Sequence, residues 1–393
     1  MSDTRGSQGW GDRALRGWGV ACALFLGANL IALWVLEPGR RADSPELAPY
    51  IDKGLDAAYP GMNEAQRRLL LRESSARMGT EALAQPREAE RRGEYVNVSA
   101  AGFRSVAEQG PWPPVPSHYN IFFFGGSTGF GYRVADEDTV ASQLQALLGD
   151  LDGRPTRIYN FSHGGFTSHQ ERLTFDRLLS LGHEPDLAVF LDGMNEFVDP
   201  SHPLGVSPSV TAAVEDKLRD PLWEAFKRLP LMQVILPRST KTPPKLLAWS
   251  RKPQAPAAER GEFDKPGRDR RVLDRYLANA AATRALADAY GVKSLFVWQP
   301  IPTYGYDLTY HAYPLHFGAH TYARYGYPRM ALRVLAGQVE PDFVWCAEIQ
   351  RGLQEPLYVD AMHYNPKLSG MLATCIAEGI VHGERPRPRP FRG

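Results

Sequence analysis

The chain has 393 residues, of which 43% are hydrophobic and 23% are charged, and its formal net charge is +1. This composition is that of a globular protein with a substantial core, which excludes a disordered or collagen-like chain. A net charge so close to zero gives no electrostatic reason to expect a nucleic acid as partner. Three cysteines (Cys22, Cys346 and Cys375) lack the spacing of a metal site, and the sequence leaves open whether Cys346 pairs with Cys375.

Segment 17–36 contains no charged residue. Twenty residues in a helix reach about 30 Å, the thickness of a bilayer core. Trp18 and Trp34, near its ends, suit the two membrane interfaces. A cleaved signal peptide is the alternative, but no small-residue cleavage site follows the apolar run. We therefore predict a single-pass transmembrane anchor in a bacterial inner membrane, with a cytoplasmic tail (1–16) before it and the rest of the chain in the periplasm.

Residues 37–116 mix helical pieces with polar connections, and we expect them to form a stalk and docking segment. Glu64–Met78 has the apolar spacing of an amphipathic helix. Tyr95–Arg104 is a β-rich run followed by a turn signal, so we expect it to dock onto the main sheet.

Residues 117–383 are predicted to form the main domain, in which short apolar strands alternate with helices. The predicted strands are 121–124, 157–161, 187–191 and 292–298, and the predicted helices are 139–148, 169–181, 270–290 and 367–381. This alternation favours a parallel sheet with right-handed crossovers. Residues 200–265, rich in proline and charge, interrupt it as an insertion, and residues 384–393 are predicted to be a disordered tail.

Segment 299–327, which leaves a predicted strand, contains seven tyrosines and three histidines. Tyrosines suit a rim that binds a sugar or an acyl chain, but they equally suit a loop packed by its own rings. The histidines lack the i, i+4 spacing of a zinc site, so we do not expect a metal there.

The polar loops that follow the strands supply the groups that acyl transfer requires. Ser127 lies on a glycine-rich turn between a strand and a helix, and a serine hydroxyl needs an adjacent base to act as nucleophile. His363 is the candidate base, and Asp360 could fix its tautomer. The N–H groups of Ser127 and Gly165 and the side-chain amide of Asn195 are candidates for the oxyanion hole. Each signal is weak alone, but together and in this order they point to one catalytic site.

These loops resemble the sequence blocks of the SGNH, or GDSL, hydrolases, a superfamily of lipases and esterases. The resemblance extends over residues 95–381, and its blocks are Gly125–Ser127, Asn160–Ser168, Gly193–Glu196 and Asp360–His363. It implies an α/β fold, a three-layer α/β/α sandwich with a five-stranded, parallel, flavodoxin-like sheet. It also implies a Ser127–His363–Asp360 triad, an oxyanion hole completed by Gly165 and Asn195, and no metal or organic cofactor.

Two positions depart from the family pattern. Gly126 stands where the first block usually has aspartate, and Glu196 stands where the third block usually has it. Neither position supplies the nucleophile, the base or an oxyanion donor, so we expect activity to survive.

The sequence therefore predicts a serine ester hydrolase that acts outside the cytoplasm on an acylated carbohydrate or lipid. Its expected partners are an ester-bearing small molecule or polysaccharide and, through one helix, a membrane, but no nucleic acid. One alternative is an O-acetyltransferase or deacetylase of a cell-envelope polysaccharide. Another is a non-catalytic envelope-binding protein with the same fold. Nucleotide binding at the glycine turn is disfavoured because no lysine stands where a phosphate-binding loop needs it.

Overall fold

The computed structural model describes residues 48–74, 78–80, 86–199, 210–211, 267–313, 317–383 and 388–389, together with positions 25, 27, 29 and 206. The chain divides into two compact units, and the unit formed by Met1–Arg41 and Asp216–Glu259 lies almost wholly outside these ranges. The predicted anchor 17–36, insertion 200–265 and tail 384–393 lie outside them too, apart from the few positions named above. Within the described ranges, no helix combines the length and apolar character needed to cross a membrane.

A six-stranded sheet forms the centre of the second unit, in the spatial order β4-β5-β3-β6-β7-β8. Its strands are β3 (Tyr119–Gly125), β4 (Asp150–Leu151), β5 (Arg154–Asn160), β6 (Leu187–Asp192), β7 (Lys293–Trp298) and β8 (Phe343–Trp345). Five strands are parallel, and counted along the chain they lie in the order 2-1-3-4-5, which is the flavodoxin-like order.

The prediction of a purely parallel sheet was wrong at one edge, because β4 pairs antiparallel with β5. A two-residue turn joins these strands, and its residues Asp152 and Gly153 have φ values of 50° and 71°. Positive φ at both central positions is characteristic of the type I′ turn that closes tight hairpins, and Asp-Gly is a favoured pair there. The sheet is therefore mixed, with β4 as its antiparallel edge.

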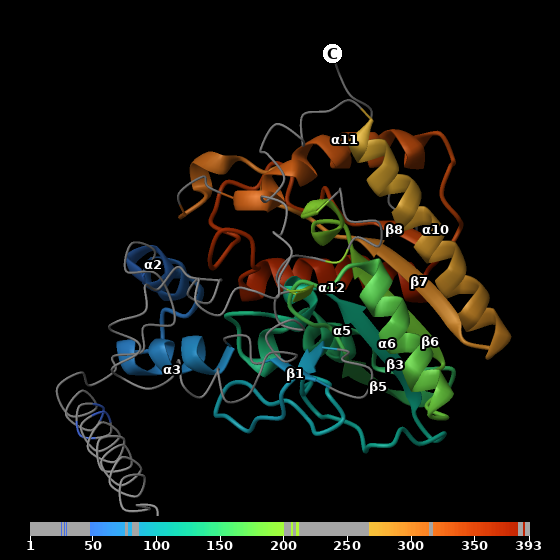
Figure 1. Cartoon of the computed structure of the whole chain (residues 1–393), viewed down its shortest axis with the longest axis horizontal. Coiled ribbons are helices and arrows are strands. Elements are labelled where there is room, and N and C mark those ends of the chain that lie inside the picture. Colours follow the sequence, from blue (N-terminus) through green and yellow to red (C-terminus); the bar gives the residue numbers. More distant parts are fainter. Residues whose placement is uncertain are drawn as a thin grey trace, which may run out of the picture. The chain divides into compact units, whose positions relative to one another are not determined.

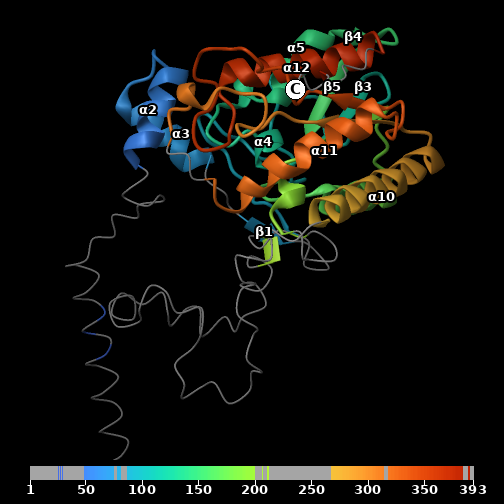
Figure 2. The same cartoon turned by 90° about the horizontal axis from the view of Figure 1, so that it is seen from above.

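Helices cover both faces of the sheet, giving three layers. Figure 2 shows α5 (Val140–Leu148) and α12 (Pro366–Val381) on one face, with α10 (Arg268–Ala289) and α11 (Ala323–Leu335) on the other. In Figure 1, α6 (Ser168–Ser180) runs beside α10.

Side chains of β3 alternate between the two hydrophobic layers, as the pleat of a strand requires. Ile121 and Phe123 pack with α5 and α12, whereas Phe122 and Phe124 pack with α6 and α10. All seven residues of β3 are buried, which explains why this stretch is apolar on both faces.

The four helices predicted for the main domain begin and end within about two residues of α5, α6, α10 and α12. Capping side chains fix three of their starts. Thr139 accepts a hydrogen bond from the N–H of Ser142, Asn365 accepts one from Leu368, and Thr167 forms a capping box before α6. Shorter elements are α4 (Ser127–Phe130), η2 (Asp136–Asp138), η3 (Asn195–Phe197), η6 (Leu308–Tyr310) and η7 (Gly318–Tyr322).

The described part of segment 37–116 belongs to the same compact unit as the sheet. It contains α2 (Ala48–Ala58), α3 (Glu64–Ser74), β1 (Met78–Thr80) and β2 (Pro86–Glu88), the last two paired antiparallel. Arg104 forms an isolated antiparallel bridge with Asn160 of β5, as expected of a docking strand. Leu55 and Leu70 share a buried cluster with Phe130 and Val359, which lie close in sequence to Ser127 and Asp360.

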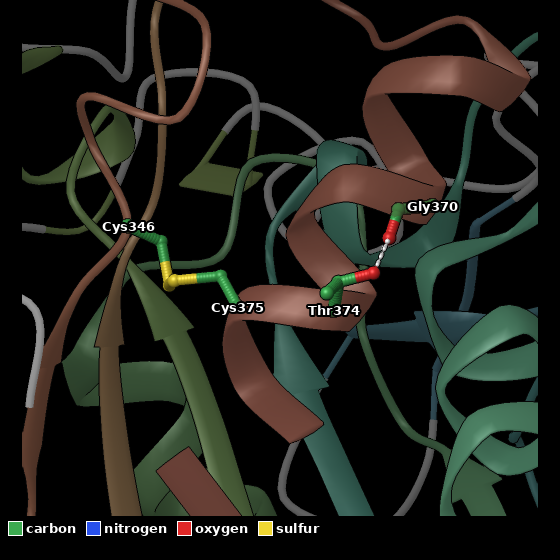
Figure 3. Close-up of a disulfide and its surroundings, with 4 residues drawn as sticks. All are labelled: Cys346, Gly370, Thr374 and Cys375. Atoms are coloured by element: carbon green, nitrogen blue, oxygen red, sulfur yellow. Dashed lines mark hydrogen bonds between the residues drawn. A yellow bond between two sulfur atoms is a disulfide. The ribbon is translucent and has the colours of Figure 1, made fainter. Parts of the chain in front are cut away.

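A disulfide joins Cys346, directly after β8, to Cys375 in α12, with 6.1 Å between their Cα atoms. Figure 3 shows this crosslink and, in the same helix, the hydrogen bond from Thr374, the residue before Cys375, to the carbonyl oxygen of Gly370. The disulfide closes a loop of the chain that contains Asp360 and His363. The pairing that the sequence left open is thus formed.

Candidate active site

The structure brings Ser127, His363 and Asp360 together in one hydrogen-bonded chain. Ser127 is the first residue of α4, directly beyond the carboxyl end of β3. The Nε2 atom of His363 lies 2.8 Å from Ser127 Oγ, and its Nδ1 atom lies 2.6 Å from Asp360 Oδ2. A hydroxyl, an imidazole and a carboxylate in this order and at these distances have the geometry of a serine hydrolase triad.

A tight loop before α12 holds the imidazole and the carboxylate in place. The Val359 N–H donates to the carbonyl oxygen of His363 at 2.9 Å, and the Asn365 N–H donates to that of Leu357 at 3.0 Å. These bonds, with a bridge between Tyr358 and Tyr364, fold the loop back on itself. Asp360 and His363 therefore lie within a hairpin-like turn and do not follow a parallel strand of the sheet.

The Asp360 carboxylate accepts four hydrogen bonds. Oδ1 accepts from the backbone N–H groups of Met362 and His363, both at 2.9 Å. Oδ2 accepts from His363 and from Nε of Arg133, the latter at 2.5 Å. Burial acts to raise the pKa of Asp360, but His363, Arg133 and these hydrogen bonds outweigh it and hold the pKa well below its usual range. The carboxylate is thus kept ionised and fixed in orientation.

Gln299 connects Thr128, the residue after Ser127, to Tyr364, the residue after His363. Its Oε1 atom accepts hydrogen bonds from Thr128 at 2.6 Å and from Tyr364 at 2.7 Å. Gln299 follows β7 directly and is almost fully buried. One amide at the edge of the sheet therefore ties together the two segments that carry Ser127 and His363.

The two other predicted oxyanion residues lie on loops beside Ser127. Gly165 has a φ of 78° in a turn closed by a hydrogen bond from the Phe166 N–H to the carbonyl oxygen of His163, a conformation that favours glycine. Asn195 is buried, and its Nδ2 donates to the carbonyl oxygen of Phe166 at 2.7 Å. The same Nδ2 lies only 2.2 Å from where a Cβ on Gly126 would stand, so the amide lies against the backbone next to Ser127.

Glu196, the second departure from the family pattern, connects the asparagine loop to α6. Its Oε1 accepts from the N–H of Ser168 at 2.7 Å, and Arg275 donates to its backbone carbonyl oxygen at 2.9 Å. Glu171 and Asp192 are buried with it, and burial raises the pKa of all three carboxyl groups. Sequence reasoning did not identify Glu171 as part of such a cluster, because nothing in its spacing distinguishes it from an exposed helical residue.

Tyrosines of the tyrosine-rich segment pack both against each other and against the rest of the domain, since Tyr304 and Tyr327 contact each other and Trp345. Tyr327 is fully buried and donates to the carbonyl oxygen of Gln299, while Tyr304 and Tyr306 donate to Glu348 and to the carbonyl oxygen of Glu355. These contacts favour the packing interpretation over a binding rim for the three tyrosines.

The histidines of this segment have separate surroundings. His311 lies 3.3 Å from the carbonyl oxygen of Tyr313 and 3.2 Å from that of Ala361, and His316 lies outside the described residues. Burial, reinforced by the nearby His363, lowers the pKa of His320 to about 4. In the part of the chain that the structure describes, no three histidine, cysteine or acidic side chains are arranged to hold a metal ion.

No protein-family model matches the chain, and neither does any curated protein. Among solved structures, it is similar to a member of the lipolytic G-D-S-L family from Veillonella parvula, with 9% identity over 66% of this chain and 96% of that one and a TM-score of 0.34. It is similar to the carbohydrate acetylesterase Est24 from Sinorhizobium meliloti, with 11% identity over 67% and 98% of the two chains and a TM-score of 0.35. It is also similar to a catalytic mutant of the acetylxylan esterase Axe2 from Geobacillus stearothermophilus, with 14% identity over 68% and 96% and a TM-score of 0.36.

Proposed function

We propose that this protein is a serine ester hydrolase of the SGNH type that works through an acyl-enzyme on Ser127. The observation that carries the proposal is the continuous hydrogen-bonded chain from Ser127 Oγ through His363 to Asp360, with distances of 2.8 and 2.6 Å. The side chains of His363 and Asp360 retain 13% and 9% of their exposure, so the site is enclosed but reachable.

In the proposed mechanism, Ser127 Oγ attacks the ester carbonyl while His363 Nε2 accepts the hydroxyl proton. Asp360 stays ionised and stabilises the imidazolium that forms. The N–H groups of Ser127 and Gly165 and the amide of Asn195 donate to the developing oxyanion. His363 then gives its proton to the departing alcohol, and water, activated by the same imidazole, releases the acid from Ser127.

The disulfide supports a location outside the cytoplasm, because such crosslinks persist mainly in oxidising compartments. Together with the predicted anchor at 17–36, it leads us to propose that the catalytic unit faces the periplasm of a bacterial cell. An ester-bearing carbohydrate or lipid of the envelope is the substrate class that such a location would offer.

The decisive experiment is intact-mass analysis after exposure to a fluorophosphonate, with Ser127→Ala treated in parallel. A single adduct on the wild-type protein, absent from the variant, is the expected result. A folded wild-type sample that takes up no adduct would overturn the proposal and favour a non-catalytic envelope-binding protein.

The same residues would serve an O-acetyltransferase or deacetylase if a sugar hydroxyl replaced water or supplied the leaving group. The proposed envelope location is what favours this second candidate. Transfer of labelled acetyl from a donor ester to polysaccharide, measured beside release of free acetate, separates transfer from hydrolysis.

A further inference from the structure

We propose that Arg133 is a positioning residue of the triad, which acts on His363 through Asp360 and is itself presented by a buttressed turn at 130–134. This inference rests on the proposed hydrolase function. Arg133 Nε and His363 Nδ1 both donate to the same oxygen, Oδ2 of Asp360, at 2.5 and 2.6 Å. The cation therefore competes with the imidazole for the charge of one carboxylate oxygen.

The turn that carries Arg133 follows the nucleophile's own short helix. Arg133 has a φ of 69°, a left-handed conformation that is unfavourable for a residue with a side chain. Such a conformation persists only where the surroundings hold it. Here it directs the guanidinium to Asp360, which lies 227 residues further along the chain.

Arg104, in the docking segment 37–116, stabilises the backbone on both sides of Arg133. Its side chain is fully buried, and its guanidinium donates to the carbonyl oxygens of Phe130 at 2.8 Å and Val134 at 2.7 Å, as well as to that of Gly131. Its Nε donates to Asp136 at 2.9 Å. One buried cation thus fixes the carbonyl groups on both sides of Arg133.

The neighbouring side chain of the turn is fixed in a similar way. Tyr132 donates to Glu88 at 2.9 Å, and its ring centroid lies 5.5 Å from that of His363. Glu88 is buried and forms an ion pair with Arg91. Tyr132 therefore contacts His363, and Arg133 binds Asp360. Both are held in place by residues that precede β3 in the chain, namely Glu88 and Arg104.

Arg133 partly neutralises the carboxylate that stabilises the imidazolium. Without it, the full charge of Asp360 would favour the protonated imidazole, which cannot accept the proton of Ser127. The acid limb of the pH–rate profile should then move to higher pH, by roughly 0.5 to 1.5 units.

Within the described residues, the other titratable or charged groups near the imidazole and Asp360 are Tyr132 with its Glu88–Arg91 pair, His311 and His320. Burial lowers the pKa of both histidines, to about 4 for His320, which is therefore uncharged above about pH 5. Two backbone N–H groups still hold Asp360 in the absence of Arg133, so the plateau rate should fall by less than about 10-fold.

The test uses the full-length protein and measures the rate constant for fluorophosphonate modification between pH 5 and 9. Arg133→Met should shift the acid limb upward, and Arg133→Lys, which keeps the cation, should return it toward the wild-type position. Arg284→Met is the matched control, because Arg284 forms a half-buried pair with Asp342, at 2.6 and 2.8 Å, without contacting the triad. It should lower Tm without moving the limb.

Identical pH profiles for wild type and Arg133→Met would overturn the positioning role while leaving the hydrolase proposal intact. Wild-type protein that is never labelled would overturn the hydrolase proposal itself. A second readout does not need activity: in Ser127→Ala, the downfield proton signal of the His363–Asp360 hydrogen bond should move on adding Arg133→Met, and an unmoved signal would also contradict the inference. If Arg133→Met does not fold, Arg133→Gln removes the charge but keeps a donor, and the same comparison applies.

Discussion

Gly126 and Asn195 occupy the same small space beside Ser127. A Cβ on residue 126 would lie 2.2 Å from Asn195 Nδ2, far inside a normal contact distance. The glycine that replaces the usual aspartate of the first block thus lets the amide of Asn195 approach the backbone next to Ser127. This departure from the family pattern is compatible with an oxyanion hole.

Gly126→Ala should therefore reduce turnover by displacing the Asn195 amide. We expect kcat for a model acetate ester to fall toward the roughly 10²–10³-fold loss that follows removal of one oxyanion donor. Tm should also fall, because the displaced amide is buried and would lose its hydrogen bond to the carbonyl oxygen of Phe166. Gly61→Ala is the control, since a Cβ there meets no atom within 4 Å. Equal kcat values for both variants would contradict the role assigned to Gly126.

Asn195→Ala should lower kcat by a similar roughly 10²–10³-fold. If Gly126→Ala acts only by moving Asn195, the double variant should be no slower than Asn195→Ala alone. Independent effects would instead multiply, so the double-mutant cycle decides between the two cases. Measured kcat values for the four proteins, at one pH and with saturating ester, complete the test.

The buried carboxyl groups of Glu171 and Asp192 predict an unusual dependence of stability on pH. Within the described residues, none of their four oxygens receives a hydrogen bond from an N–H or hydroxyl donor. Burial, followed by the charge of neighbouring carboxylates, raises the pKa of both. The folded protein therefore holds a proton more tightly than the unfolded chain, whose carboxyl groups titrate near pH 4.

It follows that this stabilisation is complete below about pH 4 and is lost as the pH rises through the raised, folded-state pKa. Glu171→Gln removes the titration, so its Tm should exceed that of the wild type by a margin that grows from pH 5 to pH 8. A gain on the order of 1 kcal/mol at pH 8, or about 2–4 °C, is expected. Asp176→Asn, on the exposed face of α6, is the matched control. A margin that is constant with pH would contradict the raised pKa values of the two carboxyl groups.

Much of the arrangement around Ser127 was predictable from the sequence because it depends on local patterns. The apolar run before Ser127 has to be a buried strand, and the short polar loops have to lie at its carboxyl edge. The spacing of Asp360 and His363 places both on one turn. These inferences need no knowledge of distant contacts.

Other features depend on contacts between distant residues or on elements too short to leave a pattern. Arg133 reaches Asp360 only because its backbone adopts a positive φ, and an arginine in the sequence does not indicate such a conformation. Strand β8 has three residues and was not predicted, whereas the hairpin of β4 and β5 carried an Asp-Gly signal that could have been used. The role of Gln299 could be inferred only by knowing that the residue after β7 lies within hydrogen-bonding distance of both Thr128 and Tyr364.

His320 predicts a loss of stability at acidic pH. Its pKa is lowered to about 4, mainly by burial, whereas an unfolded histidine titrates near pH 6.5. The unfolded chain therefore binds the proton first, and stability present above about pH 6.5 is lost as the pH falls toward 4. His320→Gln should reduce the fall in unfolding free energy between pH 7.5 and 4.5 by on the order of 2 kcal/mol. His382→Gln, at an exposed site, is the control, and equal falls in the two variants would contradict the prediction.

The disulfide predicts a separation between stability and activity. It closes a loop with a sequence separation of 29 residues, so replacing both Cys346 and Cys375 by alanine should cost about 2–4 kcal/mol of unfolding free energy. The loop's own hydrogen bonds, from Val359 to His363 and from Asn365 to Leu357, remain in the variant. Labelling of Ser127 at 25 °C should therefore stay within a few-fold of the wild type while Tm falls, and added reductant should lower Tm for the wild type only. Loss of labelling at 25 °C with an unchanged Tm would contradict this prediction. The disulfide would then be needed to position His363 and would not contribute to stability.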